Sequence, residues 1–164
     1  MIGENNIRKA EELVALLSKK GLKVTFAESC TGGLLGATLT AVSGASEVFD
    51  GSIVSYANEI KSEKLDVDKD VLNSVGAVSE ECARQMALGA CRAFSADCAA
   101  AITGIAGPLG GTPEKPVGTV YVSAAFDGEV KVEHCIFSGS RAEVREQSVE
   151  KALDMLAEII EKSR

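Results

Sequence analysis

Ser29 is the residue whose surroundings most strongly suggest chemistry. It lies between a short β-like run, residues 22–27, and a helical segment, residues 34–42, and Cys30-Thr31-Gly32-Gly33 follow it. A nucleophile at such a junction is accessible, and free backbone N–H groups near Thr31 to Gly33 can stabilise an oxyanion. A capping serine or threonine with glycines in a tight turn gives the same pattern, and such turns are common. Taken alone, the local pattern favours this second interpretation.

A nucleophilic serine needs a base, and the sequence has only one histidine that could serve as one. His134, the one histidine, falls inside a β-like run, residues 129–137, so we expect a sheet residue and no Ser-His-Asp triad. A lysine can replace the histidine when burial keeps its amine neutral. Lys61 stands one helical turn after another β-like run, residues 48–56, and Lys64 is its competitor. A solvated surface lysine is the more usual state of either residue, because lysines are rarely buried.

Three further residues follow strand-like runs or begin a helix. Tyr56 ends the run 48–56 and is either a hydrogen-bond donor to a substrate or a rim aromatic. Thr103-Gly104 ends the apolar run 98–103, which is typical of a strand buried on both faces, and is either a site group or a strand-end turn. Arg141 lies in the first turn of a helix, where the helix dipole does not favour a cation. It is therefore either a phosphate-binding residue or a surface arginine, and its position favours phosphate binding.

The order of the elements brings these residues together. Helices join the first three strands, which predicts that they are parallel, and a loop, residues 104–117, joins the third to an antiparallel fourth, residues 118–126. Asp127-Gly128 predicts a hairpin to the fifth strand. Four strands then end at one edge of a mixed sheet, where open α/β sheets bind ligands. Ser29, Tyr56, Thr103, Arg141 and the long loop all fall at that edge.

The remaining segments have conventional patterns. Apolar residues at helical spacing predict a first helix that stops at Gly21, and Ser79 is expected to cap a later helix that runs to about Phe94. Residues 66–76 are expected to be irregular, with Asp66, Asp68 and Asp70 on a solvated face. Ser140 and Glu143 form a predicted capping box at the start of the last helix.

Composition limits the classes of function. The 164 residues fit one domain, residues 1–164, and 46% hydrophobic with 25% charged residues is a globular balance. A net charge of −7, without a basic run longer than Lys19-Lys20, argues against nucleic-acid binding. The five cysteines include no C-x-x-C pair, so neither a disulfide framework nor a metal site is expected. We expect no signal peptide, no membrane partner and a cytoplasmic location.

The glycine-rich loop does not match a nucleotide-hydrolase motif. Gly107-Pro108-Leu109-Gly110-Gly111-Thr112 lacks the lysine of a P-loop and leads into a strand instead of a helix. We therefore do not expect a nucleoside triphosphatase, and we expect no cofactor.

Several long motifs in the same order resemble the CinA C-terminal domain family. They are Ala27-Glu28-Ser29-Cys30-Thr31-Gly32-Gly33, Ser55-Tyr56 with Lys61, Thr103-Gly104-Ile105-Ala106-Gly107-Pro108, and the segment 111–120. The resemblance spans nearly the whole chain. It implies a three-layer α/β/α fold with a mixed, mostly parallel five-stranded sheet.

The characterised activity of that family is nicotinamide-nucleotide amidase, of the PncC type. The resemblance implies hydrolysis of nicotinamide mononucleotide to nicotinic acid mononucleotide and ammonia by a Ser–Lys dyad, Ser29 and Lys61. It associates Tyr56 with catalysis, and Thr103 and Arg141 with the substrate. The backbone near Thr31, Gly32, Gly33 and Gly104 is then also expected to contact the substrate. A small nucleotide is the implied partner, and we expect a homo-oligomer.

The sequence departs from the family pattern in two ways. Leu109 stands where the family loop has glycine, and the sequence contains no counterpart of the N-terminal domain of full-length CinA proteins, so we expect none of that domain's activity. Two other functions are compatible with these residues: an amidase of another pyridine amide or nucleotide, and a nucleotide-binding module without catalysis. Turnover measured on a panel of pyridine amides distinguishes the first from the implied amidase. Tight binding of the mononucleotide without ammonia release identifies the second.

Overall fold

The computed structural model describes residues 1–163 and contains a five-stranded sheet between two layers of helices. The strands are β1 (Val24–Glu28), β2 (Ile53–Val54), β3 (Cys98–Gly104), β4 (Thr119–Phe126) and β5 (Glu129–Ile136). The α-helices are α1 (Glu4–Lys20), α2 (Leu34–Thr40), α3 (Asn58–Leu65), α4 (Lys69–Ser74), α5 (Glu80–Phe94) and α6 (Arg141–Lys162), and a short 3₁₀-helix spans Ala45–Glu47. No helix within residues 1–163 is both long and apolar enough to cross a membrane.

The sheet has the predicted mixed topology. Its strand order is β2-β1-β3-β4-β5, with β1 parallel to both β2 and β3, and β4 antiparallel to both β3 and β5. The carboxyl ends of β1, β2, β3 and β5 therefore lie at one edge of the sheet, as expected. This edge holds the candidate site.

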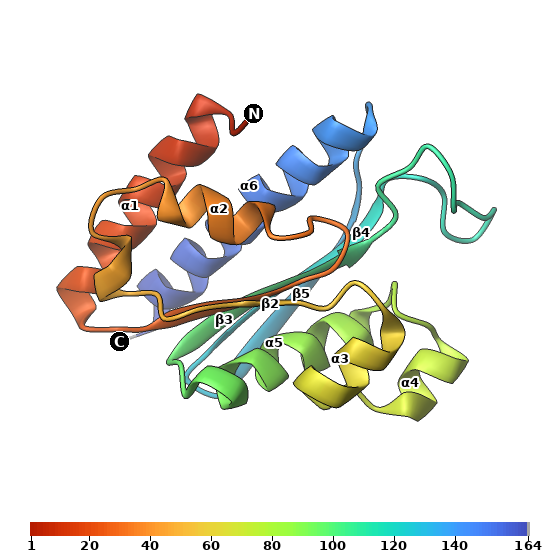
Figure 1. Ribbon diagram of the computed structural model, residues 1–164, viewed down its shortest axis with the longest axis horizontal. Helices are drawn as coiled ribbons and strands as arrows, with labels where there is room; N and C mark the ends of the chain where they lie inside the picture. Colours follow the sequence, from red (N-terminus) through yellow and green to blue (C-terminus); the bar gives the residue numbers. More distant parts are fainter. Residues whose placement is uncertain (164) are drawn as a thin grey trace.

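Two hydrophobic layers cover the sheet. Helices α1, α2 and α6 lie on one face, and α3, α4 and α5 lie on the other (Figure 1). Alternation along β3 divides its side chains between the layers: Ala100 and Ile102 face α6, whereas Ala99 and Ala101 face α5. The small alanines bring α5 close to the sheet, and the fold is the expected three-layer α/β/α arrangement.

The predicted second strand, residues 48–56, is wrong in its length. Only Ile53 and Val54 form β2, although Phe49 makes an isolated bridge with Val24. Between them the chain leaves the ladder at Gly51, whose carbonyl accepts a hydrogen bond of 2.8 Å from the Thr25 hydroxyl. A Cβ at Gly51 would lie 2.7 Å from the Phe94 ring, so packing against α5 determines this path.

The expectation of an irregular segment at residues 66–76 is also wrong, because helix α4 forms within it. Asp68 is its N-cap, and the Asp68 carboxylate accepts a hydrogen bond of 2.9 Å from the N–H of Asp70. A helix of six residues is too short to show a 3.6-residue periodicity. Asp66, Asp68 and Asp70 are exposed, as expected.

Other local predictions are confirmed. Gly21 ends α1 in the left-handed conformation, and Ser79 caps α5. Asp127 and Gly128 both have positive φ, as a two-residue hairpin turn requires. Ser140 and Glu143 form the complete capping box of α6.

One close contact places α3 against α5. A Cβ at Gly89 of α5 would overlap the carbonyl group of Leu65, the last residue of α3. Only glycine lets the two helices approach this closely. Because α3 carries Lys61, this contact also fixes the position of that lysine behind the sheet edge.

Candidate active site

Ser29 and Lys61 meet at the carboxyl edge of the sheet. Ser29 is the first residue after β1, and its N–H donates 2.9 Å to the carbonyl of Ile102 in β3, which extends the ladder by one rung. The Nζ atom of Lys61 lies 2.9 Å from Ser29 Oγ. The structure thus brings the predicted serine and lysine into direct contact, and the competitor Lys64 is exposed.

Lys61 is almost completely buried, with 1% of its surface exposed. No carboxylate of residues 1–163 forms an ion pair with it; its other partners are the carbonyls of Ser55, at 2.6 Å, and Tyr56, at 3.2 Å. Burial lowers the pKa of this amine, because water no longer solvates the ammonium form.

The three contacts of Lys61 suit a neutral amine. Carbonyl oxygens only accept, so they take the two N–H groups that a neutral amine has. The remaining lone pair is then directed to the third neighbour, the hydroxyl of Ser29. A neutral amine in this position can take the proton of the Ser29 hydroxyl.

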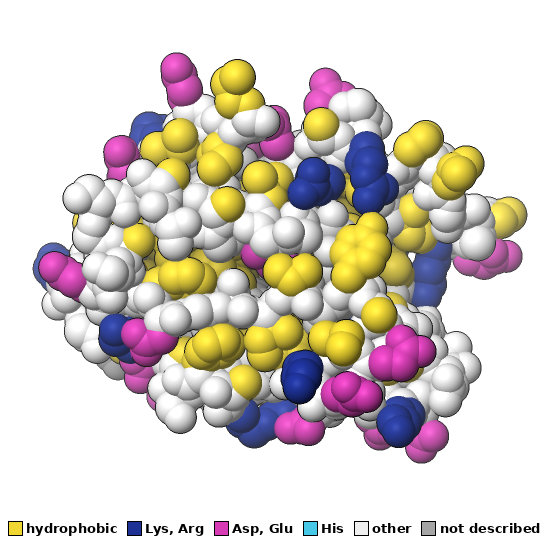
Figure 2. All heavy atoms as spheres, viewed as in Figure 1, with side chains coloured by type: hydrophobic (Ala, Val, Ile, Leu, Met, Phe, Trp, Pro, Cys, Tyr) yellow, Lys and Arg dark blue, Asp and Glu magenta, His cyan; other side chains and the backbone are white. Residues whose placement is uncertain are grey.

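A cavity of about 300 Å³ opens in front of the dyad. Ser29 and Lys61 line it, and so do the predicted residues Tyr56, Thr103, Gly104 and Arg141. Residues 105–107, 109 and 110 of the glycine-rich loop complete the lining. Leu109 of that loop, where the family has glycine, is 85% exposed at the rim. Figure 2 shows basic and hydrophobic side chains gathered at this end of the sheet, between α6 and α3.

Arg141 connects three parts of the cavity mouth. Its Nη1 donates 2.7 Å to the carbonyl of Gly107, and its Nη2 lies 3.1 Å from Tyr56 Oη. Tyr56 is 61% exposed, so its ring stands at the rim, and its carbonyl holds Lys61 below. A cation thus stands beside the first turn of α6, where an anionic group of a substrate would be stabilised.

The hydroxyl of Thr103 is tied to the protein. It donates 2.8 Å to the carbonyl of Ala77 and is buried. Its proton is therefore not available to a substrate, although the residue lines the cavity. At Gly104 a Cβ would overlap the backbone of Thr119 and Val120, so this glycine allows β3 and β4 to pair closely.

Thr31, Gly32 and Gly33 form the turn behind the nucleophile and do not line the cavity. The N–H of Gly32 donates 3.0 Å to the carbonyl of Ser29, so it is already used within the turn. The N–H groups of Cys30 and Thr31 donate to no other residue among 1–163. Of the predicted oxyanion donors, the Gly32 N–H is thus occupied, whereas those of Thr31 and Gly33 have no partner within residues 1–163.

Two charged residues beside this turn were not identified from the sequence. The buried carboxylate of Glu28 accepts hydrogen bonds from the N–H groups of Leu35, at 2.8 Å, and Gly36, at 3.0 Å, in the first turn of α2. Arg145 donates to the carbonyls of Cys30, at 3.2 Å, and Thr31, at 2.8 Å. A carboxylate next to a helix start is a recognisable signal, whereas the arginine is brought there only by the packing of α6.

The other sequence candidates lie elsewhere. His134 stacks on Tyr121 in the β4–β5 pair, with ring centroids 4.5 Å apart, and is a sheet residue as expected. Within residues 1–163 no group of His, Cys, Asp and Glu side chains is arranged to hold a metal ion.

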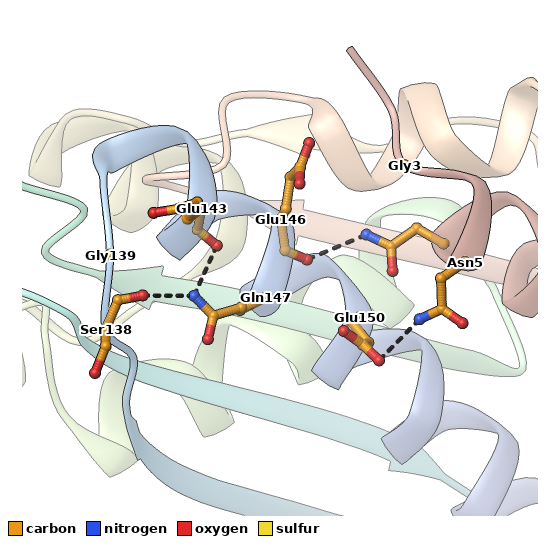
Figure 3. Close-up of a pocket in the computed structure, with 9 residues that line it drawn as sticks. Gly3, Asn5, Ser138, Gly139, Glu143, Glu146, Gln147 and Glu150 are labelled. Atoms are coloured by element: carbon orange, nitrogen blue, oxygen red, sulfur yellow. Dashed lines mark hydrogen bonds between the residues drawn. The ribbon is translucent and has the colours of Figure 1, made fainter.

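A second cavity, of about 420 Å³, lies between the start of α1 and the first turns of α6 (Figure 3). Its walls are polar and acidic, with Glu143, Glu146 and Glu150 on α6. Asn5 donates 2.9 Å to the Glu150 carboxylate, and Gln147 donates 2.8 Å to the carbonyl of Ser138. These pairs join α1, α6 and the end of β5, which is a structural arrangement.

Comparisons with known proteins agree on one family. The model of the CinA C-terminal domain matches residues 6–160. The chain is 46% identical over 154 residues to a CinA-like protein of Dictyoglomus thermophilum, covering 94% of this chain and 38% of that protein. It is 48% identical over 151 residues to a putative competence-damage inducible protein of Clostridium beijerinckii, covering 92% and 37%. The chain therefore spans less than two fifths of the length of these relatives.

Solved structures match over almost their full length. The competence/damage inducible protein CihA from Agrobacterium tumefaciens is 37% identical, with a TM-score of 0.95 and 99% of both chains covered. A CinA superfamily protein from Escherichia coli is 32% identical, with a TM-score of 0.91, covering 97% of this chain and 94% of that one.

Proposed function

Because this chain belongs to the CinA C-terminal domain family, we propose that it is an amidohydrolase that converts nicotinamide mononucleotide and water to nicotinic acid mononucleotide and ammonia. The observation that carries the proposal is the 2.9 Å contact between Ser29 Oγ and the Nζ of a buried Lys61 that has no carboxylate partner in residues 1–163. A buried lysine without a counter-ion is costly to a fold, and a role as a base explains it.

Acylation begins with proton transfer from Ser29 to the lone pair of Lys61. The Ser29 oxygen attacks the carboxamide carbon, and the carbonyl oxygen takes the negative charge as the tetrahedral intermediate forms. The N–H of Cys30, a residue that lines the cavity and whose N–H donates to no other residue among 1–163, is the candidate donor to that oxygen. Lys61 then returns the proton to the amide nitrogen, the C–N bond breaks, and ammonia leaves an ester on Ser29.

Deacylation repeats these steps with water. Neutral Lys61 takes a proton from water as the water oxygen attacks the ester carbon, and the same proton returns to Ser29 Oγ as the ester bond breaks. The product is a carboxylic acid, which ionises at neutral pH. One lysine thus serves both half-reactions, and the carbonyls of Ser55 and Tyr56 hold its amine in place throughout.

The cavity mouth supplies a site for the nucleotide phosphate. Arg141 and the first turn of α6 offer positive charge at the rim, opposite the dyad on the floor. The Tyr56 hydroxyl, bonded to Arg141, is placed to donate to the substrate or to assist proton transfer.

The test is incubation of the metal-free protein with nicotinamide mononucleotide, with ammonia and nicotinic acid mononucleotide measured together. Lys61→Ala is compared with Lys64→Ala, which removes an exposed lysine from the same helix. Equal amounts of both products from the wild type and Lys64→Ala, and none from Lys61→Ala, would support the proposal. A folded wild type that releases no ammonia from this substrate, but does so from another pyridine amide, would retain the dyad and replace the substrate.

A further inference from the structure

Arg145 holds the turn that carries the nucleophile. Its guanidinium reaches from the second turn of α6 to two consecutive carbonyls, those of Cys30 and Thr31, at 3.2 and 2.8 Å. The side chain is half-buried and forms no ion pair within residues 1–163. A guanidinium without a carboxylate partner, whose donors are directed at the backbone beside Ser29, is unusual for an arginine that serves only solubility.

The hydrogen bond from Arg145 to the Thr31 carbonyl influences the position of the Ser29 backbone. A trans peptide is planar, so its C=O and N–H point in opposite directions. The peptide between Thr31 and Gly32 directs its carbonyl to Arg145 and its N–H to the carbonyl of Ser29, at 3.0 Å. Arg145 and Ser29 thus bind the two sides of one peptide group, whose carbonyl also accepts 3.0 Å from the N–H of Leu34. The guanidinium contributes to fixing the backbone of the nucleophile through this peptide.

The hydrogen bond from Arg145 to the Cys30 carbonyl orients the next N–H group. The same planarity means that the N–H of Thr31 points away from Arg145 when the Cys30 carbonyl points toward it. That N–H has no partner among residues 1–163. Arg145 therefore also sets the direction of an N–H group two residues after Ser29.

Arg141 does a different task one helical turn earlier on α6. Its guanidinium faces the cavity mouth and binds Gly107 and Tyr56, whereas Arg145 does not line the cavity. We propose that Arg145 is the positioning residue of this active site, acting through the turn 29–33 and not through the substrate. The role in turnover rests on the proposed amidase function, whereas the role in fixing the turn does not.

The test compares Arg145→Met with Arg84→Met. Arg84 is a half-buried arginine on α5 that also donates to a carbonyl, that of Val130, at 3.4 Å, but it does not line the cavity. Two quantities are measured for each variant: the hydrogen-exchange rate of the Gly32 amide, and kcat and KM for nicotinamide mononucleotide.

In Arg145→Met we expect Gly32 exchange to accelerate about tenfold, as loss of a supporting hydrogen bond implies. We expect kcat to fall about 100-fold with KM within about threefold, because a misplaced nucleophile slows chemistry more than binding. Arg145→Lys, whose ammonium can bind one carbonyl at a time, should recover part of kcat and of the protection. Arg84→Met should change neither quantity.

Each outcome decides between roles. Unchanged Gly32 exchange in Arg145→Met would overturn the proposal, and so would a raised KM with kcat preserved, because Arg145 would then bind substrate. If Arg145→Met does not fold, Arg145→Lys is judged by the same two criteria. If the wild type does not turn over the nucleotide, the proposed function fails, and Gly32 exchange alone decides the role of Arg145.

Discussion

The cavity between α1 and α6 and the cavity at Ser29 and Lys61 differ in size and in chemistry. The cavity between α1 and α6 is larger, about 420 Å³ against about 300 Å³, and its amides and carboxylates are largely paired with one another or with the backbone. The smaller cavity has a buried lysine that contacts a serine and forms no ion pair within residues 1–163. A desolvated titratable group beside a nucleophile is thus a better guide to a site than volume is.

Of the substitutions at the two cavities, Ser29→Ala should have the largest effect on activity. We expect kcat to fall by at least about 1000-fold, because the covalent route is lost. The fold should persist, since Lys61 keeps both carbonyl partners. Ammonia release and thermal unfolding of the same preparation measure the two effects, and turnover within tenfold of the wild type would exclude Ser29 as the nucleophile.

Lys61 should make both activity and stability depend on pH. Its lowered pKa means that kcat/KM rises with pH as the amine loses its proton, with a midpoint below the ordinary lysine value of 10.5. The unfolded chain binds that proton more readily than the folded one, so the free energy of unfolding also rises with pH in this range.

Lys61→Met provides the control for the stability effect. Relative to this variant, the wild type should be least stable below the folded pKa of Lys61, and the difference should shrink as the pH approaches 10.5. Urea unfolding at several pH values tests this. Parallel curves for the two proteins would mean that Lys61 is not desolvated in the folded state.

Thr31→Val tests the turn behind the cavity. The Thr31 hydroxyl is buried and has no hydrogen-bond partner among residues 1–163, so an apolar group of the same shape should keep or raise the free energy of unfolding, by up to about 1 kcal/mol. Turnover should stay within about twofold of the wild type. A large loss of turnover would instead assign the Thr31 hydroxyl, and not only its backbone, to the substrate.

Glu146→Gln should have the smallest effect. Glu146 lines the larger cavity, and no hydrogen bond to its carboxylate forms within residues 1–163. Both kcat and KM are expected to stay within about twofold, as for other surface substitutions. A strong effect on either constant, measured with the same ammonia assay, would mean that the two cavities communicate.

The ends of the predicted strands indicate most residues of the candidate site, whereas the others are brought there by tertiary packing. Ser29, Tyr56, Thr103 and Arg141 could be placed together because parallel strands end at one edge, and the cavity confirms that they meet. Lys61 could not be recognised from its surroundings alone, since the burial of a lysine is a tertiary property, and only the family motifs indicated it. Arg145 gave no local signal because its partners are backbone carbonyls more than 100 residues earlier in the chain.

Gly89 makes the dyad sensitive to a change on a helix that supplies neither of its members. The backbone of α3 contacts this glycine, so even one methyl group at position 89 would overlap the Leu65 carbonyl and push α3 away from α5. Lys61 would move with its helix while Ser29 stayed on the sheet, and the 2.9 Å contact between them would open. The spacing of α3 and α5 therefore also sets the distance between Lys61 and Ser29.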